Sequence, residues 1–295
     1  MANLKQIKAK IKSVGNLKKI TRALEVVSTV KLQKVKSQAE WLKQYLLLVL
    51  RIMSQVSQKA DLFRSLSVRH TSTKTAVIVL TSERGLCGGL NTKLLRKVIQ
   101  EHTTSPDTEY FVVGKKGLEF LKRSGAVIVG SIQVSDKLYP KELLPLFTFF
   151  EDAIEKKEYQ RVVLYFNFFG NSILQVPSSI QLFPLTLGEI KDFFETLDIP
   201  FNAEETTVHK ELLVEPDLKA VKTELRRQIR NYVIMSALVQ NKAGEHAARM
   251  IAMKSAKDNA TSFVKSLTLK FNKERQAAIT KEISEIVSAK IAIEG

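Results

Sequence analysis

One stretch of the sequence decides the fold: residues 232–271 read YVIMSALVQNKAGEHAARMIAMKSAKDNATSFVKSLTLKF. Within it, steps of four and three residues pick out a line of mostly apolar positions, with Ser236, His246 and Lys257 as its polar members. This heptad spacing is typical of a helix that packs along a second helix. Alanines flank the line, and such small side chains let a partner helix approach closely.

The helical pattern continues on both sides of this stretch. No proline follows Pro216, and Gly244 is the only glycine between it and the terminal Gly295. We therefore expect residues 208–292 to form the C-terminal segment, helical from about residue 217 and roughly 110 Å long at about 1.5 Å per residue. A single globular core cannot cover a helix of that length, so it needs a long partner.

The N-terminal segment, residues 1–60, supplies that partner, since it contains no proline and one glycine, Gly15. Two apolar runs occupy its ends: Leu4, Ile7, Ile11 and Val14, then Val35, Ala39, Leu42, Leu46, Val49, Met53 and Val56. Between the runs, five apolar residues step mostly by threes: Leu17, Ile20, Leu24, Val27 and Val30. These steps predict that the packing face drifts there. Because the middle of the chain joins the two helices, they should run antiparallel.

Residues 73–207 have a different pattern, in which short β-rich runs alternate with helical ones. The expected strands are 75–80, 110–113, 126–129, 161–169 and 173–183, and the expected helices are 92–101, 115–123 and 142–157. Strands that alternate with helices predict an α/β layer with a mainly parallel sheet. The expected fold is therefore a Rossmann-like α/β domain between two long helices that pair as an antiparallel coiled coil.

The positive charge lies at the two ends of the chain. The formal net charge is +16; residues 1–60 hold 13 Lys and Arg against 2 Asp and Glu, a net of +11, and residues 210–295 hold 16 against 10, a net of +6. Such a surface attracts acidic partners, which include nucleic acid, anionic lipid and acidic protein. No aromatic residues interleave the basic residues between Lys8 and Lys36 and no reader motif is present, which disfavours nucleic acid.

A glycine-rich loop, TSERGLCGGLN at residues 81–91, raises the question of nucleotide binding. It lies between an expected strand and an expected helix, where backbone N–H groups can hold phosphate. Its spacing matches neither G-x-G-x-x-G nor G-x-x-x-x-G-K followed by Ser or Thr, and no acidic residue follows the second strand to bind a ribose. We interpret the loop as a tight structural turn, with Asn91 as the cap of the next helix.

The sequence offers no recognisable catalytic or metal site. Cys87, the only cysteine, precedes a helix start and could be a nucleophile, but no histidine is near it in sequence, so we expect a packed cysteine. The four histidines match no metal-ligand spacing: His70, His102, His209 and His246. No segment reads as a membrane span, and the N-terminus lacks the apolar core of a signal peptide.

Three separated motifs resemble the gamma subunit of F-type ATP synthases. The first is IKAKIKSV at residues 7–14 with KKITRALEVVS at 18–28; the second is SERGLCGGLN at 82–91, where the family has S-D-R-G-L-C-G-G-x-N. The third is the tail, with EHAARM at 245–250 and NKERQAAIT at 272–280. The motifs follow the family's order, and the resemblance covers essentially the whole chain.

The resemblance implies the central shaft of a rotary motor. In that family the paired helices sit inside a ring of alternating alpha and beta subunits, and the α/β domain lies in the foot beside the epsilon subunit and the membrane c-ring. Ion flow turns the c-ring, and the asymmetric shaft takes each beta-subunit site through its binding states. Such a subunit is non-catalytic and binds no nucleotide, cofactor or metal. It would be a peripheral membrane protein on the cytoplasmic face of the bacterial inner membrane.

By family position, six residues are expected to contact the beta subunit. Arg275 and Gln276 would hydrogen-bond a beta loop near the upper shaft. The others would lie near acidic loops of beta: Lys18, Lys19, Arg22 and Glu25. Two positions depart from the family pattern. Glu83 replaces the usual aspartate and keeps the charge, whereas Lys290 adds a charge near the shaft tip, where the family often has small residues.

Two other function classes fit parts of the sequence. A basic helical nucleic-acid-binding protein would bind with a steep salt dependence and form no complex with ATPase subunits. A Rossmann-like enzyme with helical arms would bind a nucleotide near Gly85–Gly89, where the motif is wrong. The resemblance along the whole chain favours the rotary subunit over both.

Overall fold

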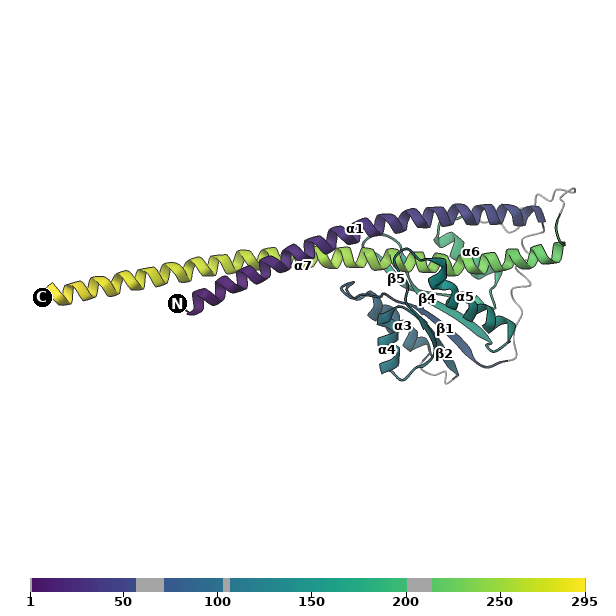
Figure 1. Ribbon diagram of the computed structural model, residues 1–295, viewed down its shortest axis with the longest axis horizontal. Helices are drawn as coiled ribbons and strands as arrows, with labels where there is room; N and C mark the ends of the chain where they lie inside the picture. The colour runs from purple at the N-terminus through teal and green to yellow at the C-terminus, as the bar shows by residue number, and fades with distance from the viewer. Residues whose placement is uncertain (1, 57–71, 103–106, 201–213, 295) are drawn as a thin grey trace. The chain divides into compact units, whose positions relative to one another are not determined.

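The structure, a computed structural model, describes four stretches of the chain: residues 2–56, 72–102, 107–200 and 214–294 (Figure 1). Two long helices begin and end it. Helix α1 spans Ala2–Val56 and helix α7 spans Leu218–Glu294. The expectation of a long helix at each end is confirmed.

The chain divides into two compact units, and each contains part of both long helices. One unit consists of Met1–Ser28 together with Arg249–Gly295, and the other is Thr29–Ala248. In the first unit, Lys257 Nζ on α7 lies 2.8 Å from Glu25 Oε2 on α1, so the two helices are in direct contact. The second unit holds the rest of the helix pair and the α/β domain.

The α/β domain is built on one five-stranded sheet in the order β3-β2-β1-β4-β5. Its strands are β1 (Thr75–Leu80), β2 (Thr108–Val113), β3 (Val127–Ile132), β4 (Arg161–Phe169) and β5 (Gln175–Phe183). The first four strands pair in parallel, and β5 is antiparallel to β4. This pairing confirms the predicted mainly parallel sheet. Helices connect its parallel strands, since parallel neighbours need a crossover connection.

In the described residues, four shorter helices accompany the sheet: α3 (Leu90–His102), α4 (Lys115–Arg123), α5 (Pro140–Glu155) and α6 (Leu187–Thr196). The first three were expected, but α6 was not. Its signal is a capping box, in which the Thr186 hydroxyl accepts from Glu189 N and the Glu189 carboxylate accepts from Thr186 N. The pattern T-x-x-E before an apolar run is readable in the sequence.

The core of the α/β domain forms where β1 and its neighbours meet α3 and α4. All six residues of β1 are buried, which fits a central strand covered on both faces. Leu94 and Val98 of α3 and Leu121 of α4 pack against this sheet and are almost fully buried. Each such side chain contributes about 1.5–3 kcal/mol of transfer free energy.

The part of α7 in the second unit lies between α1 and the sheet (Figure 1). From Asn241 to Ala247 each residue is buried, whichever side of the helix it occupies. The Tyr45 hydroxyl of α1 donates to Gln228 Oε1 of α7 at 2.6 Å. Lys31, earlier in α1, and His246, later in α7, both contact the carboxylate of Asp136. As residue numbers rise along α1, the numbers of the neighbouring residues in α7 fall. The predicted antiparallel pairing is therefore confirmed.

The packing face of α1 differs from the prediction in its middle part. Buried or half-buried side chains follow one unbroken heptad line from Ile7 to Met53, so the predicted drift is wrong. In residues 18–28 this line consists of polar side chains: Lys18, Thr21, Glu25 and Ser28. Four of the five apolar residues that step by threes are exposed instead, and Leu24 is half-buried; the exposures are Leu17 52%, Ile20 57%, Val27 49% and Val30 51%.

The two hydroxyl side chains on this line, Thr21 and Ser28, are satisfied within α1 itself. The Thr21 hydroxyl donates to Leu17 O at 3.1 Å, and the Ser28 hydroxyl donates to Leu24 O at 2.7 Å. Back-bonding to the carbonyl four residues earlier satisfies a hydroxyl inside a helix. The seam is thus polar where the sequence led us to expect an apolar one.

Candidate functional site

The junction between α7 and the sheet lies where β4 extends beyond the end of its neighbour β1. Strand β1 pairs with β4 only as far as Tyr165, although β5 accompanies β4 to Phe169. In this extension, side-chain amides of α7 accept hydrogen bonds from backbone N–H groups of β4. Asn241 Oδ1 accepts from Asn167 N at 3.1 Å, and Gln240 Oε1 accepts from Phe169 N at 3.2 Å. The helix therefore completes a strand edge that would otherwise carry unpaired N–H groups.

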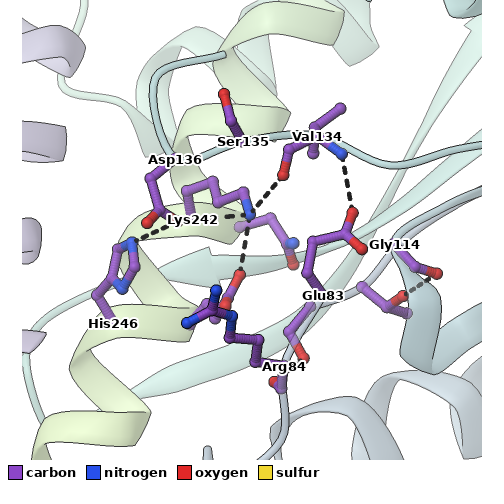
Figure 2. Close-up of polar contacts among 12 residues, drawn as sticks. Glu83, Arg84, Gly114, Val134, Ser135, Asp136, Lys242 and His246 are labelled. Atoms are coloured by element: carbon purple, nitrogen blue, oxygen red, sulfur yellow. Dashed lines mark hydrogen bonds and ion pairs between the residues drawn. The ribbon is translucent and has the colours of Figure 1, made fainter. Parts of the chain in front are cut away.

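A second set of contacts at the junction converges on Asp136, in the segment between β3 and α5 (Figure 2). Its Oδ2 lies 2.7 Å from Lys31 Nζ of α1. Its Oδ1 lies 3.2 Å from His246 Nε2 and 3.8 Å from Lys242 Nζ, both of α7. One carboxylate thus contacts both long helices.

The α7 side of this cluster is buried and charged. Lys242 is 2% exposed, Glu245 3% and His246 1%. Lys242 Nζ also lies 3.2 Å from Glu245 Oε2 and 3.5 Å from Val134 O. His246 beside Asp136, followed by Lys31 and Lys242, holds the pKa of the Asp136 carboxyl far below its usual range, although partial burial acts in the opposite direction. Asp136 is therefore ionised at neutral pH.

The segment that carries Asp136 is fixed to the rest of the α/β domain by two other carboxylates. Glu83 Oε1 accepts from Val134 N at 2.8 Å, and its Oε2 accepts from Lys115 N at 3.1 Å. Glu142 accepts from both the N–H and the hydroxyl of Ser135. Glu83, the residue that replaces the family's aspartate, therefore joins the starts of two segments that follow β2 and β3. Figure 2 shows its contact with Val134.

The glycine-rich loop is tied together by its own side chains. Asn91 Oδ1 accepts from Ser82 N at 3.1 Å, and Asn91 Nδ2 donates to Ser82 Oγ at 2.7 Å. The predicted helix cap is wrong, because α3 already begins at Leu90 and the Asn91 side chain turns back to the loop. Cys87 is buried, as expected, with its Sγ 3.4 Å from Asn91 Nδ2.

The four N-terminal residues expected to contact a partner have two kinds of environment. Lys19 and Arg22 are exposed on α1, next to the outward-facing Ile20. Lys18 and Glu25 belong to the half-buried seam, and Glu25 pairs with Lys257. The hydrogen bond to Glu25 raises the pKa of Lys257, so Lys257 is ionised at neutral pH.

The two C-terminal residues expected to contact a partner, Arg275 and Gln276, are both exposed on α7. Beyond them α7 exposes a series of large apolar side chains: Ile279 47%, Ile283 56%, Ile286 69%, Val287 51% and Ile291 66%. Lys290 lies among them and is also exposed. An apolar series of this kind is typical of a surface that binds another protein.

Two histidines lie in the described part of the chain, and both are buried. His102 Nε2 is 2.8 Å from the Tyr165 hydroxyl, and His246 belongs to the junction. His70 and His209 lie outside the described residues. Within the described residues, no group of three His, Cys, Asp or Glu side chains could hold a metal ion, and no helix is long and apolar enough to cross a membrane.

Comparison with known proteins agrees with this architecture. The sequence model of the family described as ATP synthase matches residues 3–293. The ATP synthase gamma chain of Nitrosomonas eutropha is 33% identical over 300 residues, which cover 99% of this chain and 100% of the relative. This chain belongs to the ATP synthase gamma chain family. The gamma chain of a Janthinobacterium species is similar to it at 35% identity and the same coverage.

Solved structures share the fold of this gamma-family chain. A chain of the Euglena gracilis mitochondrial ATP synthase, in a structure of its OSCP, F1 and c-ring parts, aligns with a TM-score of 0.68 at 18% identity, covering 99% of this chain and 95% of that chain. A chain from the central stalk and c-ring of the Tetrahymena thermophila mitochondrial enzyme aligns with a TM-score of 0.57 at 23% identity, covering 80% and 99%. The likeness confirms two long helices with an α/β domain between them.

Sequence reasoning found the family but missed the junction. Asp136, Lys242, Gln240 and Asn241 were not singled out, and His246 was expected only as a packed or partly exposed residue. One signal was available: residues 240–246, QNKAGEH, place several polar and charged side chains on all sides of a helix that is apolar before and after. Such a stretch indicates that the helix passes through a polar junction.

Proposed function

We propose that this chain is the rotating central-stalk subunit of an F-type ATP synthase. Rotation of a membrane c-ring, driven by ions, would turn the chain, and the turning helices would take the beta-subunit catalytic sites through their states. In reverse, ATP hydrolysis would drive ion pumping. The chain itself would be non-catalytic and bind no nucleotide, as part of a peripheral complex on the cytoplasmic face of the bacterial inner membrane.

The observation that carries this proposal is the asymmetry of the paired helices in the unit made of Met1–Ser28 and Arg249–Gly295. On α1, Leu17, Ile20 and Val27 are exposed beside the basic Lys19 and Arg22, whereas the end of α7 exposes mainly isoleucines. Different subunits of a surrounding ring would therefore meet different faces of one pair. The basic residues fit acidic loops on beta, and the isoleucines fit an apolar bearing formed by alpha and beta.

The foot partners follow from the same proposal. The α/β domain would contact epsilon and the c-ring, and nucleic acid would not be a partner. The polar loop of residues 82–91 supports a structural role, because its side chains bond one another and Asn91 Oδ1 accepts from Ser82 N. Family members from bacteria, 33–35% identical over nearly the whole chain, support the bacterial location.

Co-expression with the alpha and beta subunits of the same organism tests the proposal. We expect a stable complex with robust ATP turnover only when this chain is present. Arg275→Ala should lower ATP synthesis by about tenfold, as expected when a charge-assisted interfacial contact worth about 1.4 kcal/mol is lost. Lys219→Ala, at an exposed position near the start of the same helix, is the control. If alpha and beta neither bind this chain nor respond to it, the proposal is wrong, and DNA binding across a salt titration becomes the next measurement.

A further inference from the structure

The cluster around Asp136 contains more charge than packing alone requires. Lys242 and Glu245 are almost completely buried, yet apolar residues of similar volume would pack in their place at equal or lower free energy. Buried charges of this kind are best known for fixing one arrangement of packed helices among several alternatives. Their position is informative, because they occur where α7 lies between α1 and the α/β domain.

Apolar packing by itself gives the domain only shape-dependent resistance to a turning force. Burial of apolar surface is non-directional, so an apolar helix face resists rotation about its axis only through shape. Charge-assisted hydrogen bonds depend on both distance and angle. Asp136 makes a short charged contact to Lys31 of α1 at 2.7 Å, and its other carboxylate oxygen lies 3.2 Å from His246 Nε2 of α7.

The backbone around Asp136 is suited to receive force from the helices. Glu83 binds Val134 and also Lys115 N at the start of α4, and Glu142 of α5 binds Ser135. Two consecutive residues before Asp136 are therefore held by carboxylates from two different elements. Figure 2 shows the contacts of Asp136 with α7, through which a displacement of that helix at Lys242 or His246 would reach the α/β domain.

We propose that Asp136 is a positioning residue that locks the α/β domain to both long helices, so that turning force passes between the domain and the helix pair. This inference rests on the proposed function, since it assigns a path for the torque. The amides of Gln240 and Asn241 hold α7 to β4, whereas Asp136 joins α1 and α7 to the domain at one point. Without Asp136 the subunit still assembles, but the domain slips under load.

The test compares ATP hydrolysis with ATP-driven ion pumping by the whole membrane-bound enzyme in inverted vesicles. The variants are Asp136→Asn, Asp136→Glu and Lys31→Met, and Asp152→Asn on the surface of α5 is the control. We expect Asp136→Asn and Lys31→Met to keep the hydrolysis rate within about twofold and to lower ions pumped per ATP about threefold or more, with partial rescue by Asp136→Glu. The double variant Asp136→Asn with Lys31→Met should be no worse than Asp136→Asn, because both remove the same contact.

An unchanged ratio of pumping to hydrolysis in both single variants would overturn the lock. A proportional fall of pumping and hydrolysis would overturn it too, because that result means a loss of assembled enzyme without slippage. The proposed function fails separately, when the unaltered chain does not assemble with alpha and beta. Asp152→Asn should leave both activities unchanged, since Asp152 pairs only at the surface, with Lys156 at 2.9 Å.

Discussion

Gly114, between β2 and α4, has a backbone conformation that a side chain would strain. Its φ is +100°, and a Cβ at this position would overlap the Thr81 carbonyl group. We predict that Gly114→Ala lowers the free energy of unfolding by about 2 kcal/mol or more. Gly15→Ala is the matched control: a Cβ there meets nothing within 4 Å, and helix propensity should add about 1 kcal/mol. Thermal unfolding of the isolated chain measures both, and equal effects would contradict the account.

The carboxylate of Asp136 should make the unfolding stability of the chain depend on pH in the acid range. Its pKa is lower in the folded chain than the ordinary value of 3.8. A lowered pKa contributes stability that is fully present above the ordinary value and is lost as the pH falls through the folded-state pKa. Asp136→Asn should therefore lower the free energy of unfolding at neutral pH. Below about pH 4, the free energy of unfolding should decrease less with falling pH in the variant than in the unaltered chain. Urea unfolding across this range is the measurement; parallel curves for both proteins would refute the prediction.

At the scale of elements, the polar seam of α1 and α7 is the main surprise. Glu25 and Lys257 are both about one-fifth to one-quarter exposed, so their ion pair is partly screened. We predict that Lys257→Met lowers unfolding stability by about 1 kcal/mol, and that a double-mutant cycle with Glu25→Gln gives a coupling of about 0.5–1 kcal/mol. A coupling of zero would mean that the seam does not depend on this pair. Lys281→Met, on the exposed part of α7, is the control.

The elements themselves were largely predictable from the sequence, and their contacts were not. Periodicity and β-rich runs located both long helices, the five strands and α3, α4 and α5 to within a few residues. The packing face of α1 was misread because apolar residues were assumed to face the partner helix, whereas Thr21, Glu25 and Ser28 do so. Side chains that bond their own helix or a charged partner can occupy such a seam, and apolar spacing does not reveal that.

At the scale of the whole molecule, the family and the fold could be recognised from motifs, but the junction could not. Asp136 is about a hundred residues from both Lys31 and Lys242 in sequence, and no pattern links the three. Their meeting depends on the sheet order, which brings the segment after β3 to α7. The six residues expected to contact beta remain predictions, because only a partner subunit can test them.

The central claim is that this chain turns inside a ring of alpha and beta subunits. The most direct measurement fixes an assembled alpha–beta complex to a surface and attaches a bead to the α/β domain through Lys122→Cys, an exposed position on α4. We predict continuous rotation in one direction that starts with ATP and stops with a tight-binding inhibitor of the beta sites. A complex that hydrolyses ATP while the bead shows only Brownian motion would contradict it.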